Sequence, residues 1–401
     1  MPFFSRIYLF VVTIFVLMMP GRAVATDGCD TTVWFVNIYP GSEIYELEGH
    51  SALRIKTCEW DMAVNYGMFS FDSPNFIYRF VKGETDYMVG AIPWEYFIAG
   101  YIQTGRRVVA HELGMTSEQK ARLIDLVAEN LKPENRVYRY NYVLDNCATR
   151  PLRMVELAMG DTLILSEPVT EPSLKTFRDY MQYYHSNYPW YQFGIDIALG
   201  KGIDRPINVR EKAFAPVVLE SQIDETTVGA TEGHKLIVDK EVLFDAEPFG
   251  VVLPGTPWYM SPVFVFWVIA LLLTCYSVRL VFHRHRYPRL VATLLFTLYG
   301  LAGLLVAFLV FVSVHEATSP NVNLLWLNPL CFIPVVGLWL KKAKKLNYWY
   351  FLINFVLLIG VIVLWVAGYQ EPNSGFIPLV LVDMLFSALY IYQLRFDCEK
   401  N

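Results

Sequence analysis

The sequence predicts an exported α+β domain followed by an all-α membrane domain of about five helices. The composition is apolar, with 54% hydrophobic and 18% charged residues and a mean hydropathy of +0.34. These values exclude a disordered chain and disfavour an ordinary soluble enzyme. Residues 256–401 hold ten Lys or Arg against five Asp or Glu, whereas residues 1–255 hold 23 against 33. Nucleic-acid binding is disfavoured, because the polar first part lacks the basic excess that would replace phosphate counterions.

The first 25 residues have the organisation of a secretory signal. Arg6 supplies the charged start, and Ile7 to Met19 form an apolar run too short to span a bilayer comfortably. Ala23-Val24-Ala25 fits the small-x-small cleavage rule. An uncleaved anchor is the alternative, because Arg22 lies close to the cleavage site. We therefore expect residues 1–25 to be a signal peptide and residues 26–255 to be exported.

The exported part alternates strand-like runs with two helical patterns, which is typical of an α+β domain. Ser117 is a potential cap for a helix over Ser117–Leu131, in which apolar residues recur at a spacing of 3.6. A second helical pattern covers Leu152–Met159. The extended runs are Thr32–Tyr39, His50–Lys56, Ala63–Phe69 and Arg106–Glu112, with a further run at Tyr138–Val143.

Residues 256–401 form the predicted membrane domain. Each of its five apolar segments approaches the roughly 20 residues needed to cross a bilayer, the third and fifth being the short ones. Asn328, Pro329 and Pro334 interrupt the third segment, and Asp383 lies inside the fifth. A broken helix or an acidic side chain at membrane depth is a candidate for function, and it is tolerated only where it contacts other parts of the protein or a water-filled cavity. The alternative is a short helix with an acid wetted from the outer surface. The segments are Pro262–Phe282, Leu290–Val314, Leu324–Leu340, Tyr348–Gly368 and Phe376–Tyr392.

The loops between these segments predict the orientation. Residues 283–289 and 341–345 are rich in Lys and Arg, whereas residues 315–323 and 369–375 contain neither. Basic loops stay in the cytoplasm. Residues 26–255 then lie outside the cytoplasm, in agreement with the signal peptide.

Three cysteines fall in the exported part, so one thiol stays free in an oxidising compartment. Cys29 and Cys58 are the closest pair in sequence and flank two strand-like runs, which predicts a disulfide between them. Cys147 is then the free thiol. It follows Asp145-Asn146, both good helix N-caps, so its sulfur would lie where unpaired N–H groups and the helix dipole favour a thiolate.

Two alternatives to this interpretation of Cys147 stay open. A lone cysteine is more commonly buried and inert, although the polar sequence from Asp145 to Arg150 argues against burial. Pro151 also makes the helix start less regular, so the cap could lie nearer Arg150.

A thiol nucleophile needs a base, for which His50 is the candidate. His50 follows Gly49 at the start of a strand, where the glycine lets backbone or substrate come close. A solvated or hydrogen-bonded histidine at a strand end is the alternative. Asn65 on the next strand is the best polar candidate to orient the imidazole. The other histidines of the exported part are weaker candidates, because His111 ends a strand but faces a polar turn, His185 lies in an aromatic segment and His234 lies in a loop.

A histidine in a strand, followed about a hundred residues later by Asn146-Cys147 opening a helix, resembles the permuted papain-like arrangement of the lecithin:retinol acyltransferase and cell-wall thiol peptidase superfamily. More closely, four stretches resemble a bacterial lipoprotein N-acyltransferase family, in which an exported thiol domain precedes a C-terminal membrane domain. These stretches are Gly49 to Arg54, Asn65-Tyr66-Gly67, Tyr142 to Thr149, and the tail with His315 and Asn323–Leu330.

The resemblance implies an acyltransferase of a bacterial inner membrane with a periplasmic catalytic domain, using no cofactor and no metal ion. An acyl group from a membrane phospholipid passes to Cys147 as a thioester, and His50 removes the thiol proton. N–H groups at Asn146-Cys147 stabilise the oxyanion. The α-amine of a lipoprotein's diacylglyceryl-cysteine then accepts the acyl group. Both substrates reside in the bilayer, which gives the spans a role beyond anchoring.

Polar residues near the outer surface are candidates for docking the lipid or the acceptor, namely His315, Asn323, Asn328 and Asp383. The alternative is an ordinary solvated loop with a capping asparagine, which we favour for Asn321. Two other functions also fit parts of the sequence. A membrane-bound cell-wall cysteine peptidase or amidase could use the same Cys–His pair, and a non-catalytic binding module would use neither.

Overall fold

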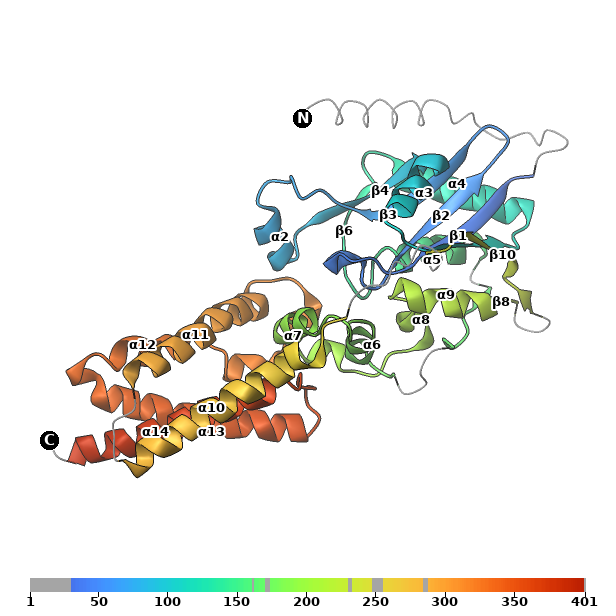
Figure 1. Ribbon diagram of the computed structural model, residues 1–401. Coiled ribbons are helices and arrows are strands. Elements are labelled where there is room, and N and C mark those ends of the chain that lie inside the picture. The colour runs from blue at the N-terminus through green and yellow to red at the C-terminus, as the bar shows by residue number, and fades with distance from the viewer. Residues whose placement is uncertain are drawn as a thin grey trace. The chain divides into compact units, whose positions relative to one another are not determined.

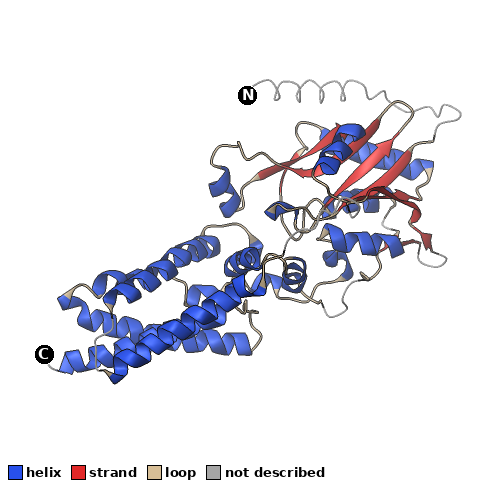
Figure 2. Ribbon diagram, viewed as in Figure 1, coloured by secondary structure: helices blue, strands red, loops and turns tan. Residues whose placement is uncertain are grey.

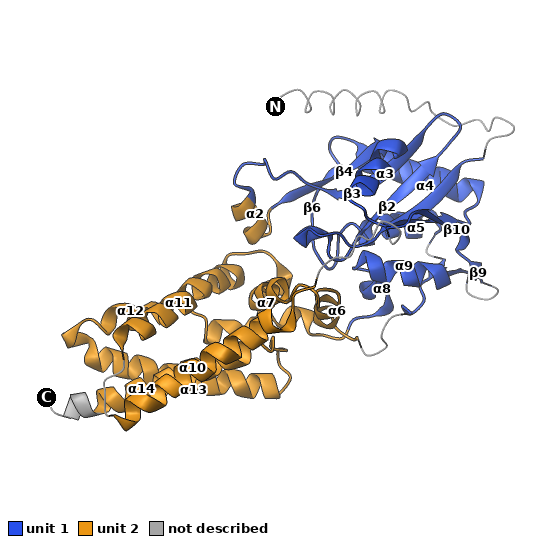
Figure 3. Ribbon diagram, in the orientation of Figure 1, with its two compact units in different colours: residues 1–76, 85–173, 207–253 blue, residues 77–84, 174–206, 254–401 orange. Residues whose placement is uncertain are grey.

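The computed structural model describes residues 30–160, 162–169, 174–229, 233–246, 255–283 and 288–399, with side chains through residue 395. Its contacts divide the chain into two compact units (Figure 1, Figure 3). Unit 1 comprises residues 1–76, 85–173 and 207–253, and unit 2 comprises residues 77–84, 174–206 and 254–401. Strands gather in unit 1, whereas unit 2 is built from helices (Figure 2). The expected signal peptide, residues 1–25, lies outside the described residues.

Unit 1 is built around a seven-stranded antiparallel sheet of order β10-β5-β1-β2-β3-β4-β6. Strands β1 and β2 pair from Thr32↔Lys56 to Ile38↔His50, whereas β2 and β3 pair only from Leu53↔Val64 to Lys56↔Asp61. The first three residues of β2, His50 to Ala52, therefore pair with β1 but not with β3. The strands are β1 (Thr32–Ile38), β2 (His50–Lys56), β3 (Asp61–Met68), β4 (Asp86–Pro93), β5 (Val108–Leu113), β6 (Val137–Arg139) and β10 (Ile237–Phe244), and a small second sheet joins β7 (Leu163–Ile164), β8 (Thr227–Val228) and β9 (His234–Lys235).

Alternate residues of the central strands face two apolar layers. Val33 and Phe35 of β1 belong to a large core that includes side chains of α4 (Ser117–Leu131), α5 (Thr149–Ala158) and α9 (Pro216–Glu225). Val36 and Ile38 belong to a smaller core with α3 (Trp94–Gln103). Because side chains alternate between the faces of a strand, helices cover both faces of the sheet.

The α+β expectation is confirmed at the level of a β-rich N-terminal unit. The predicted bounds of the strand His50–Lys56 and the helix Ser117–Leu131 agree with the structure. Thr116 caps that helix in place of Ser117, because its Oγ1 accepts the N–H of Gln119 while the Gln119 side chain accepts the N–H of Thr116.

Other strand predictions were incomplete. The run Tyr138–Val143 is extended only to Arg139, because Asn141 and Asp145 then bond to each other in a turn. The sequence pattern missed β4, which contains Gly90 and ends at Pro93, and it missed β10. Strand β10 is an edge strand with mostly exposed side chains, so it carries little of the apolar alternation that predicts strands.

Within its described residues, unit 2 contains four helices that are long and apolar enough to cross a membrane, namely Pro262–Phe282, Arg289–Phe311, Lys341–Val366 and Phe376–Arg395. The predicted fifth segment is therefore not short, since its helix continues past Tyr392. The corresponding elements are α10 (Pro262–Phe282), α11 (Arg289–Phe311), α13 (Lys344–Val366) and α14 (Phe376–Glu399).

The predicted third span, Leu324–Leu340, is not one continuous helix. It consists of short turns at Val322–Leu325 and Pro329–Cys331 followed by α12 (Phe332–Gly337). The Oδ1 of Asn328 accepts the N–H of Leu330 and so starts a new turn at the proline. A Cβ at Gly303 of α11 would lie only 2.4 Å from the backbone N of Asn328. The broken segment therefore packs against α11 by close backbone approach, which glycine permits.

The remaining helices of unit 2 lie outside these spans. They are α2 (Phe76–Lys82), whose residues from Ile77 onward belong to this unit, α6 (Phe177–Tyr184) and α7 (Pro189–Ala198). The fully buried Arg178 of α6 binds the carboxylates of Asp196 and Asp204. The amide of Asn373 donates to Asp196 at 2.8 Å, which ties the loop before α14 to α7. An internal ionic network thus holds the non-spanning part of unit 2.

Candidate active site

His50 is the first residue of β2. It follows Gly49, which has a φ of +82° and whose Cβ, if present, would lie 2.5 Å from the carbonyl oxygen of Ile38. Only glycine therefore allows the strand to start in this way. The Nε2 atom of His50 lies 2.7 Å from Oδ1 of Asn65 on β3. Because a carbonyl oxygen only accepts, Nε2 donates this bond and Nδ1 is the acceptor nitrogen of the ring.

Cys147 lies in the turn that leads into α5. The Oδ1 atom of Asn146 accepts the N–H groups of Ala148 and Thr149 at 2.9 and 3.0 Å, so Asn146 acts as the cap. Pro151 stands near the start of α5 between Arg150 and Leu152, whose N–H groups donate to the carbonyls of Asn146 and Ala148, so the proline leaves out one bond of this series without ending the helix. The cysteine is thus held just before a helix N-terminus, as its sequence context predicts.

The sulfur of Cys147 lies beside the first residues of β2. The backbone N–H of Ser51, the residue after His50, donates to this sulfur. On the β3 side, Gly67 has a φ of +85°, and a Cβ there would lie 3.3 Å from the Cβ of Cys147. A larger residue at position 67 would therefore crowd the thiol. The structure thus joins His50 to Asn65 directly and places the Cys147 sulfur against Ser51, the residue that follows His50.

Burial sets the protonation of the pair. Desolvation raises the pKa of the Cys147 thiol to about 11, although hydrogen bonds from Tyr140 and from the Ser51 N–H oppose the shift. Desolvation also lowers the pKa of His50 to about 4, against the opposing effect of the bond to Asn65. Both changes disfavour charge. The resting pair is therefore a neutral thiol beside a neutral imidazole, and the thiolate expected from the helix dipole is not the resting form.

The oxyanion donors at Asn146-Cys147 stay a prediction, and the backbone N–H of Asn146 already donates to Oγ1 of Thr149 at 2.8 Å. The first free N–H groups of α5 are consumed by Asn146, and the amide Nδ2 of Asn146 donates to the carbonyls of Tyr142 and Phe214, both at 2.7 Å. Asn146 therefore has no side-chain donor left for a substrate. The backbone N–H groups of Cys147 and Ser51, both directed at the sulfur, are the donors at the reacting atom.

Sequence reasoning missed the aromatic residues of the site. The hydroxyl of Tyr140 lies 4.0 Å from the Cys147 sulfur, and the ring of Tyr101 stacks on His50 at a centroid distance of 6.3 Å. Tyr140 in turn stacks on Tyr87 at 4.2 Å. One signal was available, because Tyr138, Tyr140 and Tyr142 alternate just before the cysteine. Tyr87 and Tyr101 lie on elements that are distant in sequence and left no such signal.

An aromatic row leads from the thiol to the surface of unit 1. Phe69 contacts Tyr87 at a centroid distance of 5.2 Å, and its ring also contacts Phe71 at 4.8 Å and Tyr45 at 6.2 Å. Phe71 and Tyr45 are 62% and 60% exposed. Rings thus run without interruption from Tyr140 beside the sulfur to solvent, which gives an apolar molecule a surface to follow.

The predicted docking residues have structural partners in unit 2. His315 lies after α11, and its Nε2 donates to the carbonyl of Phe80 in α2 at 2.9 Å. Asn323 is fully buried, where its Nδ2 donates to the carbonyl of Asp196 and its Oδ1 accepts from the indole of Trp326. These side chains, like the capping amide of Asn328 described above, are engaged within the fold.

Asp383 is fully buried inside α14 and is not wetted from the surface. Its Oδ1 accepts from the Nδ2 of Asn354 on α13 at 2.8 Å and from the hydroxyl of Ser387 at 3.3 Å. The Asp383 carboxyl group is therefore hydrogen-bonded to other side chains of the protein, as a polar group inside a membrane requires. Asn321 caps the turn that follows it, as predicted, but it is buried and not solvated, because its Nδ2 donates to the carbonyls of Ile197 and Ala198 at 3.0 and 3.2 Å.

The described residues contain one group of side chains with metal-ligand chemistry, formed by His111, Glu220 and Asp224. Nε2 of His111 lies 3.0 Å from Asp224. Lys240 binds both carboxylates, at 2.6 Å from Asp224 and 3.3 Å from Glu220. The lysine supplies the positive charge that these acids require, so the group is an internal ion-pair cluster on β5, α9 and β10. It explains why His111 does not take part in the thiol site.

Among the described side chains, Cys147, Cys275 and Cys331 are free thiols, and Cys58 is disulfide-bonded. Cys29 lies outside the described residues, so its pairing with Cys58 stays a prediction.

The fold and the site define a membrane-anchored protein, with a β-rich unit that carries a cysteine–histidine–asparagine arrangement and a helical unit of spanning length. Two family models match the chain in this same order. The Lnb N-terminal periplasmic domain matches residues 25–183, and the Lnb transmembrane domain matches residues 255–396. The chain therefore belongs to the Lnb family of apolipoprotein N-acyltransferases. No curated protein and no solved structure matches it.

Proposed function

We propose that this chain is a lipoprotein N-acyltransferase that works through a Cys147 thioester. The observation that carries the proposal is the arrangement at the thiol: Asn65 holds Nε2 of His50, and the N–H of Ser51 reaches the Cys147 sulfur. The Cys147 thiol thus lies beside the start of the strand that carries a base and its orienting group, and these three groups are what nucleophilic acyl transfer requires. Family membership supports the same reaction class.

In the first half-reaction, Nδ1 of His50 takes the thiol proton as the sulfur attacks the ester carbonyl of a membrane phospholipid. The backbone N–H groups at Ser51 and Cys147 stabilise the tetrahedral oxyanion. The intermediate collapses by breaking the bond to the glycerol oxygen, which receives the proton from His50. The products are an acyl-Cys147 thioester and a lysophospholipid.

In the second half-reaction, the α-amine of a diacylglyceryl-cysteine lipoprotein attacks the thioester carbonyl. His50 takes a proton from the amine, the new amide forms, and the sulfur leaves as a thiolate that recovers a proton from His50. A neutral imidazole suits both steps, because it can accept a proton at the start of each. The aromatic row beside Tyr140 gives the acyl chain an apolar surface close to the sulfur.

The proposal includes the architecture that this chemistry needs. Residues 1–25 direct export, residues 26–255 form a permuted papain-like periplasmic domain, and residues 256–401 anchor it in the bacterial inner membrane. The antiparallel sheet with a histidine near the start of one strand and a cysteine at the start of a helix supports the papain-like relationship. Phospholipid and lipoprotein are then the two partners, both supplied by the bilayer.

Expression in a bacterium depleted of its own lipoprotein N-acyltransferase tests the proposal. Wild-type protein should add one acyl chain to lipoprotein N-termini, as measured by mass spectrometry, whereas Cys147→Ala and His50→Ala should add none. Cys275→Ala, which removes an exposed thiol in α10, is the matched control and should retain activity. Free α-amines in cells that contain well-expressed wild type would refute the proposal, and cleaved peptidoglycan in those cells would favour a peptidase.

A further inference from the structure

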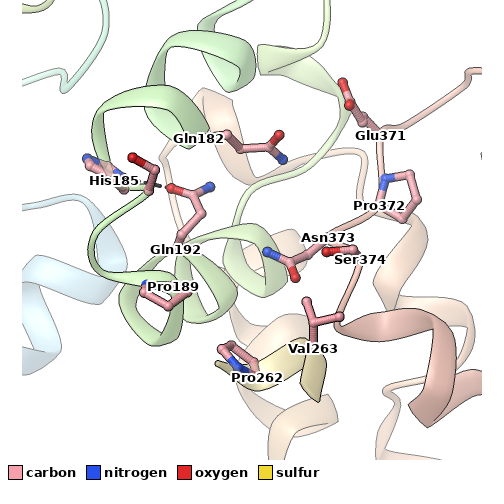
Figure 4. Close-up of a pocket in the computed structure, with 11 residues that line it drawn as sticks. Gln182, His185, Pro189, Gln192, Pro262, Val263, Glu371, Pro372, Asn373 and Ser374 are labelled. Carbon is pink, nitrogen blue, oxygen red and sulfur yellow. Dashed lines mark hydrogen bonds between the residues drawn. The ribbon is translucent and has the colours of Figure 1, made fainter. Parts of the chain in front are cut away.

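Unit 2 contains a polar pocket at the level where two of its spanning helices begin (Figure 4). The cavity has a volume of about 330 Å³ and is lined by residues of α6 and α7, by Pro262 at the start of α10, and by the loop Glu371 to Ser374 that leads into α14. A volume of this size is typical of small-molecule sites. The place and the size both suit a lipid headgroup.

One side of the pocket presents an unused donor. Gln192 of α7 is 95% buried, and its Oε1 accepts from Nδ1 of His185 at 2.7 Å. Within the described part of the chain, its Nε2 has no hydrogen-bond partner. A buried N–H without a partner is costly, so an acceptor that entered the pocket would gain this bond. Phosphate oxygens are such acceptors.

The other side of the pocket is acidic. Glu371 lines it, and the carboxylates of Asp179, Asp196 and Asp204 lie near enough to act on Glu371, against the single guanidinium of Arg178. Glu371 is exposed to solvent, and its partial desolvation followed by these acids raises its pKa. An ammonium group beside Glu371 would relieve this excess of negative charge.

An apolar cavity of about 370 Å³ adjoins the polar pocket, since Pro372 lines both. Its walls are aliphatic side chains of α13 and α14, together with Trp365. The indole Nε1 of Trp365 is buried and, among the described residues, has no hydrogen-bond partner. A residue of the cavity wall therefore has a donor without a partner in the described part of the chain, and an ester carbonyl at the top of an acyl chain is an acceptor of the kind that this donor needs.

We propose that the two cavities together bind one phosphatidylethanolamine-type phospholipid. Glu371 holds its ammonium group, Nε2 of Gln192 donates to its phosphate, and Nε1 of Trp365 donates to a glycerol ester while the acyl chain follows α13 and α14. The diacylglyceryl-cysteine of a lipoprotein has an amine and acyl chains but no phosphate for Gln192. The role of this lipid as the acyl donor rests on the proposed function, whereas its binding does not.

Native mass spectrometry of the full-length Cys147→Ala protein, which cannot turn over, tests the binding. Phosphatidylethanolamine and phosphatidylglycerol with the same acyl chains are supplied in equal amounts. One phosphatidylethanolamine should be retained in preference. Glu371→Gln and Gln192→Glu should each weaken its retention about tenfold, corresponding to about 1.4 kcal/mol. The Gln192→Glu side chain keeps an acceptor for His185 and replaces the donor with a carboxylate oxygen, whose negative charge also repels a phosphate.

Trp365→Phe should weaken the binding of both lipids, because it removes the indole donor to a glycerol ester and both lipids carry that ester. Trp349→Phe on the same helix, where the side chain is 50% exposed, is the matched control and should bind as the parent does. Equal retention of the two lipids, or unchanged retention by both headgroup variants, would overturn the proposal. So would displacement of the lipid by a synthetic diacylglyceryl-cysteine peptide at equal concentration.

Photocrosslinking with a diazirine phosphatidylethanolamine needs no variant that might misfold. Adducts on peptides that cover residues 362–381 are expected, and adducts found only elsewhere would contradict the site. If lipid binds here but lipoproteins stay unmodified, the acyltransferase function is refuted and the lipid site is supported. If lipoproteins are acylated but no lipid binds here, the lipid site is refuted and the acyltransferase function is supported.

Discussion

At the scale of single residues, burial controls the chemistry of the thiol site. The helix start next to Cys147 favours a thiolate, but Asn146 consumes the N–H groups of Ala148 and Thr149 that would stabilise it. Desolvation then dominates and keeps both Cys147 and His50 neutral. The proton therefore leaves the sulfur only when a substrate is attacked, which protects the thiol from adventitious oxidation.

The rate of Cys147 alkylation should rise steadily with pH. With a thiol pKa of about 11, only about one molecule in ten thousand carries the thiolate at pH 7, and this fraction grows about tenfold per pH unit up to pH 10. His50, with its pKa lowered to about 4, stays neutral over this range and adds no inflection. Iodoacetamide labelling followed by peptide mass spectrometry measures the rate, with Cys147→Ala as the blank. A plateau between pH 5 and pH 8 would reveal a thiolate–imidazolium pair and contradict the prediction.

Asn65→Ala should reduce acyl transfer without abolishing it. The bond from His50 Nε2 to Asn65 fixes the ring and becomes charge-assisted when His50 accepts the thiol proton. A hydrogen bond to a charged group contributes about 1.5 to 3 kcal/mol, so kcat should fall about ten- to hundredfold while KM changes little. Steady-state kinetics with purified lipoprotein decides this, and the surface substitution Asn135→Ala serves as the control. Loss of activity as complete as in Cys147→Ala would give Asn65 a direct role in the chemistry.

At the scale of elements, short backbone approaches decide where segments lie. In the site, Gly49 and Gly67 let β2 and β3 approach other backbone and the thiol without a side chain between them. In the membrane unit, Gly303 does the same for the broken segment after α11. These positions share a steric requirement and no common sequence motif.

Gly303→Ala should destabilise unit 2. The new methyl group would lie 2.4 Å from the backbone N of Asn328, so α11 and the broken segment must separate. Overpacking of this kind costs about 1 to 3 kcal/mol. Thermal unfolding in detergent should show a lower Tm. Gly360→Ala in α13 is the matched control, because a Cβ there meets nothing within 4 Å and alanine favours a helix, so its Tm should be equal or higher.

At the scale of the whole molecule, the two compact units interleave along the chain. Residues 77–84 and 174–206 belong to unit 2, although unit 1 surrounds them in sequence. A division at one position in the chain, such as residue 255, therefore separates sequence segments and does not coincide with the contacts. The residues of the thiol site all belong to unit 1, and the residues that line the two cavities all belong to unit 2.

Reporter fusions should give the topology that the basic loops predict. Fusions after Arg286 and Lys344 should be cytoplasmic, and those near Pro320 and Asn373 should be exported, because loops rich in Lys and Arg stay inside. Alkaline phosphatase and fluorescent-protein activities report the two sides. Inverted signals would place unit 1 in the cytoplasm, where neither lipoprotein maturation nor the predicted Cys29–Cys58 disulfide is expected.

The sequence by itself predicted the β-rich and helical parts, a membrane domain of five spans, of which four are long helices in the structure, and Cys147, His50 and Asn65 as the candidate site. These features depend on local composition, on periodicity and on residues that are close in the chain. Only the tertiary structure decided that the Asn146 amide bonds to the carbonyl of Phe214, that Asn323 is engaged inside the fold, and that Tyr87 and Tyr101 lie close to the thiol and His50. Those roles depend on contacts between residues far apart in sequence and on desolvation, and the order of residues along the chain carries neither.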